Sequence, residues 1–357
     1  MTKLTIQPTS NPAASFKAGL VRRAFGMLVL TGAVWPTLQP AQAQGKTNTP
    51  IVIQFSHVVT PETAKGQAAL RFKALAEART QERVRVEVYP NSQLYKDREE
   101  LDALKLGAVQ MIAPSLSKLA TLGGGDFEVF DLPFLFKDRT EFRAAVASPL
   151  GASLFLKLEG SGVKGLAYWD SGFKVFTANR ALRATTDFQG QRFRVQASKV
   201  LVTQMKTLGA TASVSPLTSV YDSLKRGQLD GQENTPINIY TQRLHEVQGH
   251  LTISNHGYLA YAVLVNKAFW DKLPTEVRHA LEAALQEATT FEYGLAQAEN
   301  EKALERISAH PGLKVHTLSP TEIQQWRTAV APVYRAARST ISPETLAALK
   351  AVDAPSP

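Results

Sequence analysis

The segment from His245 to His250, with the sequence HEVQGH, places two histidines and a carboxylate close together. In many zinc hydrolases, two histidines four residues apart on one helix hold the metal, with a glutamate directly after the first. Here the spacing is five, so on a helix the second imidazole would point about 140° away from the first. We therefore interpret these histidines as surface residues, and no metal site is predicted.

Motifs for other kinds of catalysis are missing from the sequence. It has no G-x-S-x-G nucleophile elbow, no G-x-x-x-x-G-K-[ST] phosphate loop and no cysteine, which excludes thiolate metal sites and a cysteine nucleophile. The acids Glu99 and Glu100 lie in a segment of alternating acids and bases, which is typical of a solvated helix face. We predict a protein without a cofactor that is not an enzyme, and a secreted hydrolase or lyase is the alternative.

Positive charge is concentrated near the N-terminus. The 357-residue chain has a formal net charge of +9, and residues 1–43 hold four basic residues and no acid. An apolar run of about 11 residues, too short to span a bilayer, follows Arg22 and Arg23 and precedes an Ala-Gln-Ala cleavage sequence at 41–43. We predict that 1–43 is a cleaved signal peptide for export to the periplasm, by the Sec or the Tat route.

The rest of the chain carries its charge in a dispersed form. Without the four N-terminal charges the formal net charge is +5, and no stretch beyond residue 43 holds five like charges in a row. Proteins that follow a phosphate backbone present a basic stripe, which this pattern does not provide. Nucleic acid is therefore not an expected partner.

Alternating strand and helix patterns must position any functional side chain. Strands are expected in short β-branched or apolar segments: 51–55, 84–88, 109–112, 163–169, 193–195, 212–214 and 261–265. Helices are expected between them, the first with Thr60 as its N-cap, and a long one is expected over about 275–309. This order predicts two α/β lobes, with a parallel sheet in the first and ligands at the carboxyl ends of its strands.

Several stretches resemble the solute-binding proteins of tripartite ATP-independent periplasmic (TRAP) transporters. Residues 190–234 contain GQRFRV, an LGA turn and DGQEN, which are marks of that family. YPNSQL at 89–94, DLPFLF at 131–136 and VNKAFWDKLP at 265–274 agree in order. The stretches FSHVVTPETAKGQ, APSLSK, WDSGFK, RVQASKVL and NIYTQRLHEVQ are most similar to the branch that binds four-carbon dicarboxylates.

The resemblance implies a two-lobed α/β fold of the periplasmic-binding-protein type II-like kind. Each lobe would be a mixed sheet flanked by helices, with the ligand cleft between the lobes. Lobe I is expected at 44–171 and 260–300, and lobe II at 172–259 and 301–357. The protein would capture succinate, malate or fumarate and deliver it to a TRAP membrane permease. A sugar acid, a 2-oxo acid or an aromatic acid stays open as the ligand.

The resemblance also implies a set of ligand-binding residues. The signature arginine of the family falls on Arg194, whose guanidinium can bind a carboxylate through two parallel hydrogen bonds. The second cationic position falls on Lys174, and the amide of DGQEN is Asn234. A second carboxylate needs its own cation, which would be Lys65 or Lys174. Trp169 is a candidate wall of the cleft, and a core position is the alternative interpretation.

Overall fold

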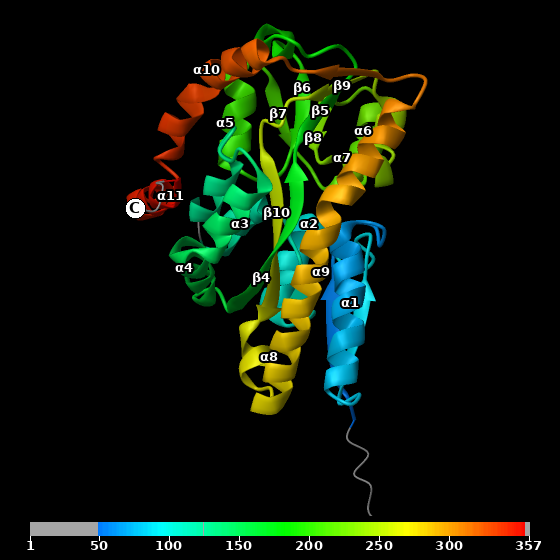
Figure 1. The fold of residues 1–357 in the computed structure, drawn as a ribbon, viewed down its shortest axis with the longest axis vertical. Coiled ribbons are helices and arrows are strands. Elements are labelled where there is room, and N and C mark those ends of the chain that lie inside the picture. The colour runs from blue at the N-terminus through cyan, green and yellow to red at the C-terminus, as the bar shows by residue number, and fades with distance from the viewer. Residues whose placement is uncertain (1–48, 124, 354–357) are drawn as a thin grey trace, which may run out of the picture. The chain divides into compact units, whose positions relative to one another are not determined.

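The computed structural model describes residues 49–123 and 125–353, and the side chains of 350–353 are not described. The predicted signal peptide at 1–43 lies outside this range, so its cleavage and export route stay predictions. The described strands form two mixed sheets with helices around them (Figure 1). This is the expected fold class.

The first sheet has the strand order β2-β1-β3-β10-β4. Its strands are β1 (Ile51–Ser56), β2 (Val84–Tyr89), β3 (Met111–Ile112), β4 (Val163–Phe173) and β10 (Tyr258–Asn266). Strands β1, β2 and β3 are parallel, as their β-α-β-α-β order predicts, and α1 (Ala64–Arg79) and α2 (Asp97–Leu106) connect them. Strand β10 is antiparallel to both β3 and β4, which makes the sheet mixed.

The second sheet has the strand order β11-β9-β5-β8-β6-β7. Its strands have four residues each: β5 (Val175–Ala178), β6 (Arg192–Val195), β7 (Thr211–Val214), β8 (Gly231–Asn234), β9 (His250–Ile253) and β11 (Lys314–Thr317). Strand β6 is parallel to β7 and β8, whereas β5 is antiparallel to β8 and β9. Helices α5 (Lys199–Thr207) and α6 (Val220–Lys225) lie between β6, β7 and β8 in the chain.

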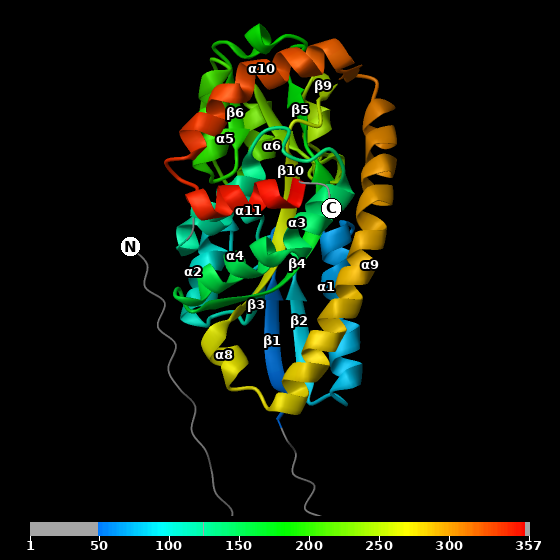
Figure 2. The ribbon, with the colours of Figure 1, turned by 60° about the vertical axis from the view of Figure 1, so that its left-hand side comes forward.

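Two chain crossings and one long helix join the two sheets. Only Lys174 separates β4 from β5, and the segment 254–257 links β9 to β10. Helix α9 (Thr275–Ser308) has 34 residues, a length of about 50 Å. It packs on α1 and β4 of the first sheet and on α7 (Pro236–Thr241), which follows β8 (Figures 1 and 2). One face of α9 is buried and includes Val277, Leu281, Leu285 and Ala288.

The remaining helices cover the two sheets. They are α3 (Arg139–Ala147), α4 (Pro149–Glu159), α8 (Lys267–Asp271), α10 (Pro320–Ala337) and α11 (Pro343–Asp353). Short 3-10 turns are η1 (Leu116–Leu122), η2 (Gly125–Asp131), η3 (Thr185–Phe188), η4 (Leu217–Ser219) and η5 (Leu244–Val247). A capping box opens α10, since Glu322 accepts a hydrogen bond from the Ser319 N–H at 2.7 Å. In the part of the chain that the structure describes, no helix is apolar over a length that would cross a bilayer.

The N-cap prediction for the first helix is wrong. Thr63, and not Thr60, caps α1, because its Oγ1 accepts a hydrogen bond from the Gly66 N–H at 3.1 Å. The carbonyl of Thr60 instead accepts a 2.9 Å hydrogen bond from the Thr63 hydroxyl. Pro61 therefore belongs to the turn that precedes the helix.

Candidate functional site

The carboxyl ends of parallel strands from both sheets converge on one cavity. Its walls include residues that end or follow these strands: Ser115 after β3, Gln196 after β6, Ser215 after β7 and Asn234 at the end of β8. The main part has a volume of about 330 Å³ and contacts Arg194 and Lys118. A narrower extension reaches Tyr261 on β10. This is the sheet edge at which α/β proteins hold small ligands.

Arg194 on β6 is a predicted site residue that lines this cavity, and it is buried, with 2 % of its surface exposed. Its Nε and Nη2 groups donate hydrogen bonds to the Ser215 carbonyl at 3.0 and 2.9 Å. Burial lowers the pKa of Arg194, but a guanidinium stays protonated in proteins. Because one edge of the planar group is fixed, the Nη1/Nη2 edge keeps two parallel N–H groups for a carboxylate.

Lys118 on η1 is a second buried cation in the cavity and is not among the residues predicted from the sequence. It forms an ion pair with Asp97 at the start of α2. The second carboxylate oxygen of Asp97 accepts a hydrogen bond from the Leu217 N–H at 2.8 Å. Burial would raise the pKa of Asp97, but Lys118 and Arg194 hold it at about 2. Lys118 ends the APSLSK motif, and this motif is the sequence feature that could have identified it as a site residue.

The expectation that Glu99 and Glu100 lie on a solvated helix face is wrong for Glu100. Asp97 and Glu100 are buried, whereas Glu99 is exposed. Asp97 and Glu100 lie one turn apart and therefore share a helix face. This face is turned toward Lys118 and Lys65, whose charges act on Glu100.

Lys65 on α1 is buried beside the cavity and does not line it. Its ammonium donates a 2.8 Å hydrogen bond to the Ala113 carbonyl and lies 3.7 Å from the centre of the Tyr261 ring. Tyr261 itself lines the cavity extension. Burial lowers the pKa of Lys65 to about 7, and Glu100 opposes this shift.

Asn234 lines the cavity extension together with Asn238. Its Oδ1 accepts hydrogen bonds from the Thr235 N–H and from Asn238 Nδ2, both at 2.9 Å. The oxygen of the amide is therefore occupied within the protein, and the Nδ2 group keeps its hydrogens for a ligand acceptor.

The structure places the other two predicted site residues elsewhere. Lys174 lies at the crossing between the sheets and forms a buried ion pair with Glu233, whose carboxylate is 3.5 Å from His256 Nε2. Trp169 is packed in the core of the first sheet, 6.0 Å from the Phe55 ring, and its Nε1 donates a 2.9 Å hydrogen bond to Thr289 Oγ1. Neither residue is part of the cavity wall around Arg194. The structure thus brings together Arg194 and Asn234, with Lys65 behind them.

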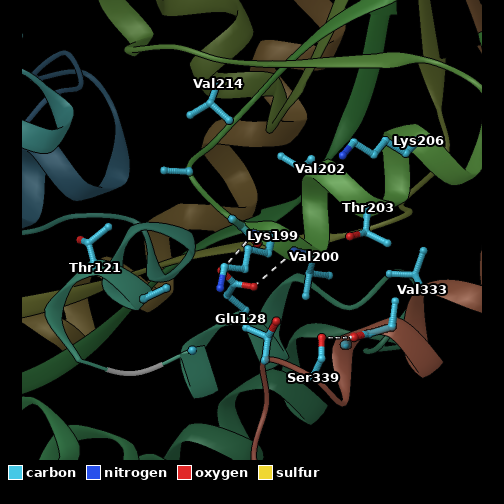
Figure 3. Close-up of a pocket in the computed structure, with 17 residues that line it drawn as sticks. Thr121, Glu128, Lys199, Val200, Val202, Thr203, Lys206, Val214, Val333 and Ser339 are labelled. Atoms are coloured by element: carbon cyan, nitrogen blue, oxygen red, sulfur yellow. Dashed lines mark hydrogen bonds between the residues drawn. The ribbon is translucent and has the colours of Figure 1, made fainter.

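A larger groove of about 740 Å³ adjoins the cavity between α5, η2 and the end of α10 (Figure 3). The two depressions share Thr121, Ala197 and Val214. In the groove, the Glu128 carboxylate accepts hydrogen bonds from the N–H groups of Lys199 and Val200, at 3.0 and 3.3 Å. A protein carboxylate therefore already occupies the N-terminus of α5, where an anionic ligand could otherwise bind.

The histidines of the HEVQGH segment are placed differently from the prediction. His245 is buried, with 6 % of its surface exposed, and stacks on Tyr240 at 5.3 Å. His250 begins β9 and is half-buried. Within the described residues, no group of three or more His, Asp or Glu side chains is arranged to hold a metal ion.

Two mixed β-sheets flanked by helices, with a buried cationic cavity at their strand ends, are typical of a binding protein for small anionic solutes. The sequence model of the bacterial extracellular solute-binding proteins, family 7, matches residues 55–340, and the chain belongs to this family. This confirms the family resemblance and the fold class expected from the sequence.

Relatives and solved structures agree with this assignment. The chain is 49 % identical over 336 residues to the C4-dicarboxylate-binding periplasmic protein DctP of Rhodobacter capsulatus, covering 94 % of this chain and 99 % of the relative. A TRAP periplasmic solute-binding protein of Shewanella oneidensis with bound succinate has a TM-score of 0.83 and 39 % identity, covering 86 % of this chain and 100 % of that one. One of Pseudomonas aeruginosa with bound L-malate has a TM-score of 0.79 and 39 % identity, covering 80 % and 100 %.

Proposed function

We propose that this protein is the periplasmic receptor of a TRAP transporter and binds a four-carbon dicarboxylate such as succinate or malate. The main observation is the pair of buried cations, Arg194 and Lys118, in one cavity at the strand ends of both sheets. Its relatives with bound succinate and L-malate support the ligand class. Export by a signal peptide cleaved after Ala43 and delivery to a membrane permease are parts of the same proposal.

Each end of the ligand has a different partner in this proposal. One carboxylate binds the Nη1/Nη2 edge of Arg194, which the Ser215 carbonyl holds in place through the opposite edge. The second carboxylate binds Lys118, whose present partner is Asp97. Asn234 donates from Nδ2 to a ligand oxygen. A monocarboxylate lacks the second group, so Lys118 would keep Asp97 as its partner.

Ligand binding would also hold the two sheets together. Lys118 belongs to the η1 segment that follows β3 of the first sheet, whereas Arg194 is on β6 of the second. A ligand that contacts both favours the arrangement in which the two come close, and a permease that recognises this arrangement receives only loaded receptor.

Calorimetry of the purified protein with succinate, L-malate and fumarate tests the proposal, with butyrate as the monocarboxylate control. We expect micromolar dissociation constants, a binding free energy of about −8 kcal/mol, and at least tenfold weaker binding of butyrate. No binding of any of the three dicarboxylates would refute the ligand assignment. Turnover of a bound acid, followed by NMR, would instead identify an enzyme.

A further inference from the structure

Glu100 is a buried carboxylate beside the proposed binding site that the proposed function does not use. Its side chain on α2 is 0 % exposed, and neither carboxylate oxygen has a hydrogen-bond partner. A charged carboxylate without hydrogen bonds is costly to bury, because nothing replaces the water it has lost. Glu100 is therefore held in its charged form only by the field of neighbouring cations.

The charged groups around Glu100 come from three elements. Lys118 on η1 and Lys65 on α1 favour its charged form, and Asp97, one turn earlier on α2, opposes it. Asp97 is held as a carboxylate by its ion pair with Lys118 and by the Leu217 N–H. Of this group, Glu100 is the acid whose charged form has the fewest direct contacts.

Two further titratable groups face Lys65. His57 follows β1, is buried, and has no hydrogen-bond partner at either ring nitrogen. Burial and the charge of Lys65 lower the pKa of His57 to about 3, so it is neutral. Glu292 on α9 also acts on Lys65, and burial raises the pKa of Glu292 well above its usual value.

The charge balance of the site changes when a dicarboxylate enters. Arg98 also lines the cavity but is exposed to solvent. Among the buried groups, with all of them ionised, the cations Arg194, Lys118 and Lys65 face the acids Asp97 and Glu100, which leaves one net positive charge. A ligand dianion would reverse this to one net negative charge in a buried region, where uncompensated charge is unfavourable. One added proton would make the loaded site neutral.

We propose that binding of the dicarboxylate dianion is accompanied by uptake of one proton, and that Glu100 is the group that takes it. This inference rests on the proposed function. Protonation removes the charge of the carboxylate that has no hydrogen-bond partner, and it creates an O–H donor in its place. Through this protonation, Glu100 would adjust the net charge of the site to that of the bound ligand.

Burial raises the pKa of Glu100 to about 7, against the effect of Lys118 and Lys65. The added negative charges of a ligand shift the pKa further upward. Lys65 is the alternative proton acceptor, since burial lowers its pKa to about 7 as well. Its ammonium, however, already has the Ala113 carbonyl and the Tyr261 ring as partners for the charged form. Glu100 has no such partner for its charged form.

Calorimetry in buffers with different ionisation enthalpies tests this inference. For the wild-type protein with succinate at pH 8, the dependence of the heat on the buffer should correspond to uptake of about one proton, and at pH 6 to much less. The dissociation constant should rise by up to about tenfold per pH unit above pH 7. In E100Q both effects should be lost. E99Q, the same change at the exposed neighbour on α2, should keep both.

The outcomes separate this inference from the proposed function. No binding of succinate would refute the proposed function, whereas binding without proton uptake by the wild-type protein at pH 8 would overturn only the inference. Uptake that persists in E100Q would overturn the role of Glu100. If E100Q does not fold, NMR of glutamate carboxyl carbons in the wild-type protein decides. We expect one signal with a pKa near 7 that moves upward with succinate, and its absence would contradict the inference.

Discussion

Two buried clusters in this protein both bring lysine and carboxylate side chains together, but their charges are balanced differently. At the crossing between the sheets, Lys174 faces the carboxylate of Glu233 directly. In the cavity, Nε and Nη2 of Arg194 donate hydrogen bonds to an uncharged partner, the Ser215 carbonyl. The charges of Lys118 and Lys65 both act on Glu100. A buried cation paired with a carboxylate of the protein stabilises the fold, whereas a buried site with excess positive charge favours binding of an anion.

The largest expected effect is on stability, at the crossing. Lys174→Met should lower the free energy of unfolding by about 3 to 5 kcal/mol, because it leaves the carboxylate of Glu233 buried without its partner. Urea denaturation measures this loss. The double variant K174M/E233L should recover much of the stability. A K174M protein as stable as wild type but unable to bind succinate would reverse the roles of the two clusters.

The same ion pair predicts how stability depends on acid pH. Burial would raise the pKa of Glu233, but Lys174 and His256 hold it at about 2 in the folded protein, below its usual value of 4.5. A lowered folded-state pKa means that the stabilisation is complete above the unfolded value and is lost as the pH falls from about 4.5 toward 2. E233Q should therefore lose less stability over this interval than wild type. Equal losses, measured by thermal unfolding, would contradict the assignment.

The next effect is on affinity, in the cavity. Arg194→Ala should weaken succinate binding at least tenfold, since truncating a buried charged hydrogen-bonding partner costs about 2 to 5 kcal/mol. Calorimetry measures the change, and the ligand-free protein should lose less stability than K174M. An unchanged dissociation constant would show that the site lies elsewhere.

Lys118→Met should separate dicarboxylates from monocarboxylates. We expect about tenfold weaker binding of succinate, because its second carboxylate loses its cation, and little change for butyrate, which never reaches that position. Competition calorimetry compares the two ligands. Equal losses for both ligands would indicate that Lys118 supports the cavity and does not select the ligand.

The smallest effect is expected at Trp169. Trp169→Phe removes the hydrogen bond to Thr289 and part of the packing against Phe55, a loss of about 1 to 2 kcal/mol of stability. The dissociation constant for succinate should stay within about twofold of wild type. A larger loss of affinity with unchanged stability would indicate that Trp169 lines the binding site.

Whether the sequence predicts an element or a site residue depends on whether the contacts that fix it are local in the chain. The β-branched strand pattern at 84–88 and the long helical pattern at about 275–309 are local, and both are confirmed by β2 and α9. The burial of Glu100 was missed because a helix with alternating charges looks the same whether one face meets water or meets Lys118. The partner of Lys174 is Glu233 on β8, and no pattern around Lys174 indicates it.

The family motif predicts Arg194 as a site residue, whereas its local pattern alone favours a surface arginine. Lys118 lies in the APSLSK motif, which indicates the family branch but assigns no role to its individual residues. The structure adds the distances between segments, and these decide which cations share a cavity.

A crystal structure of the protein with succinate tests the central claim most directly. The account predicts one carboxylate on the Nη1/Nη2 edge of Arg194 and the other within hydrogen-bond distance of Lys118, with Asn234 donating to a ligand oxygen. Succinate bound in the groove beside Glu128, or at Lys174, would contradict it.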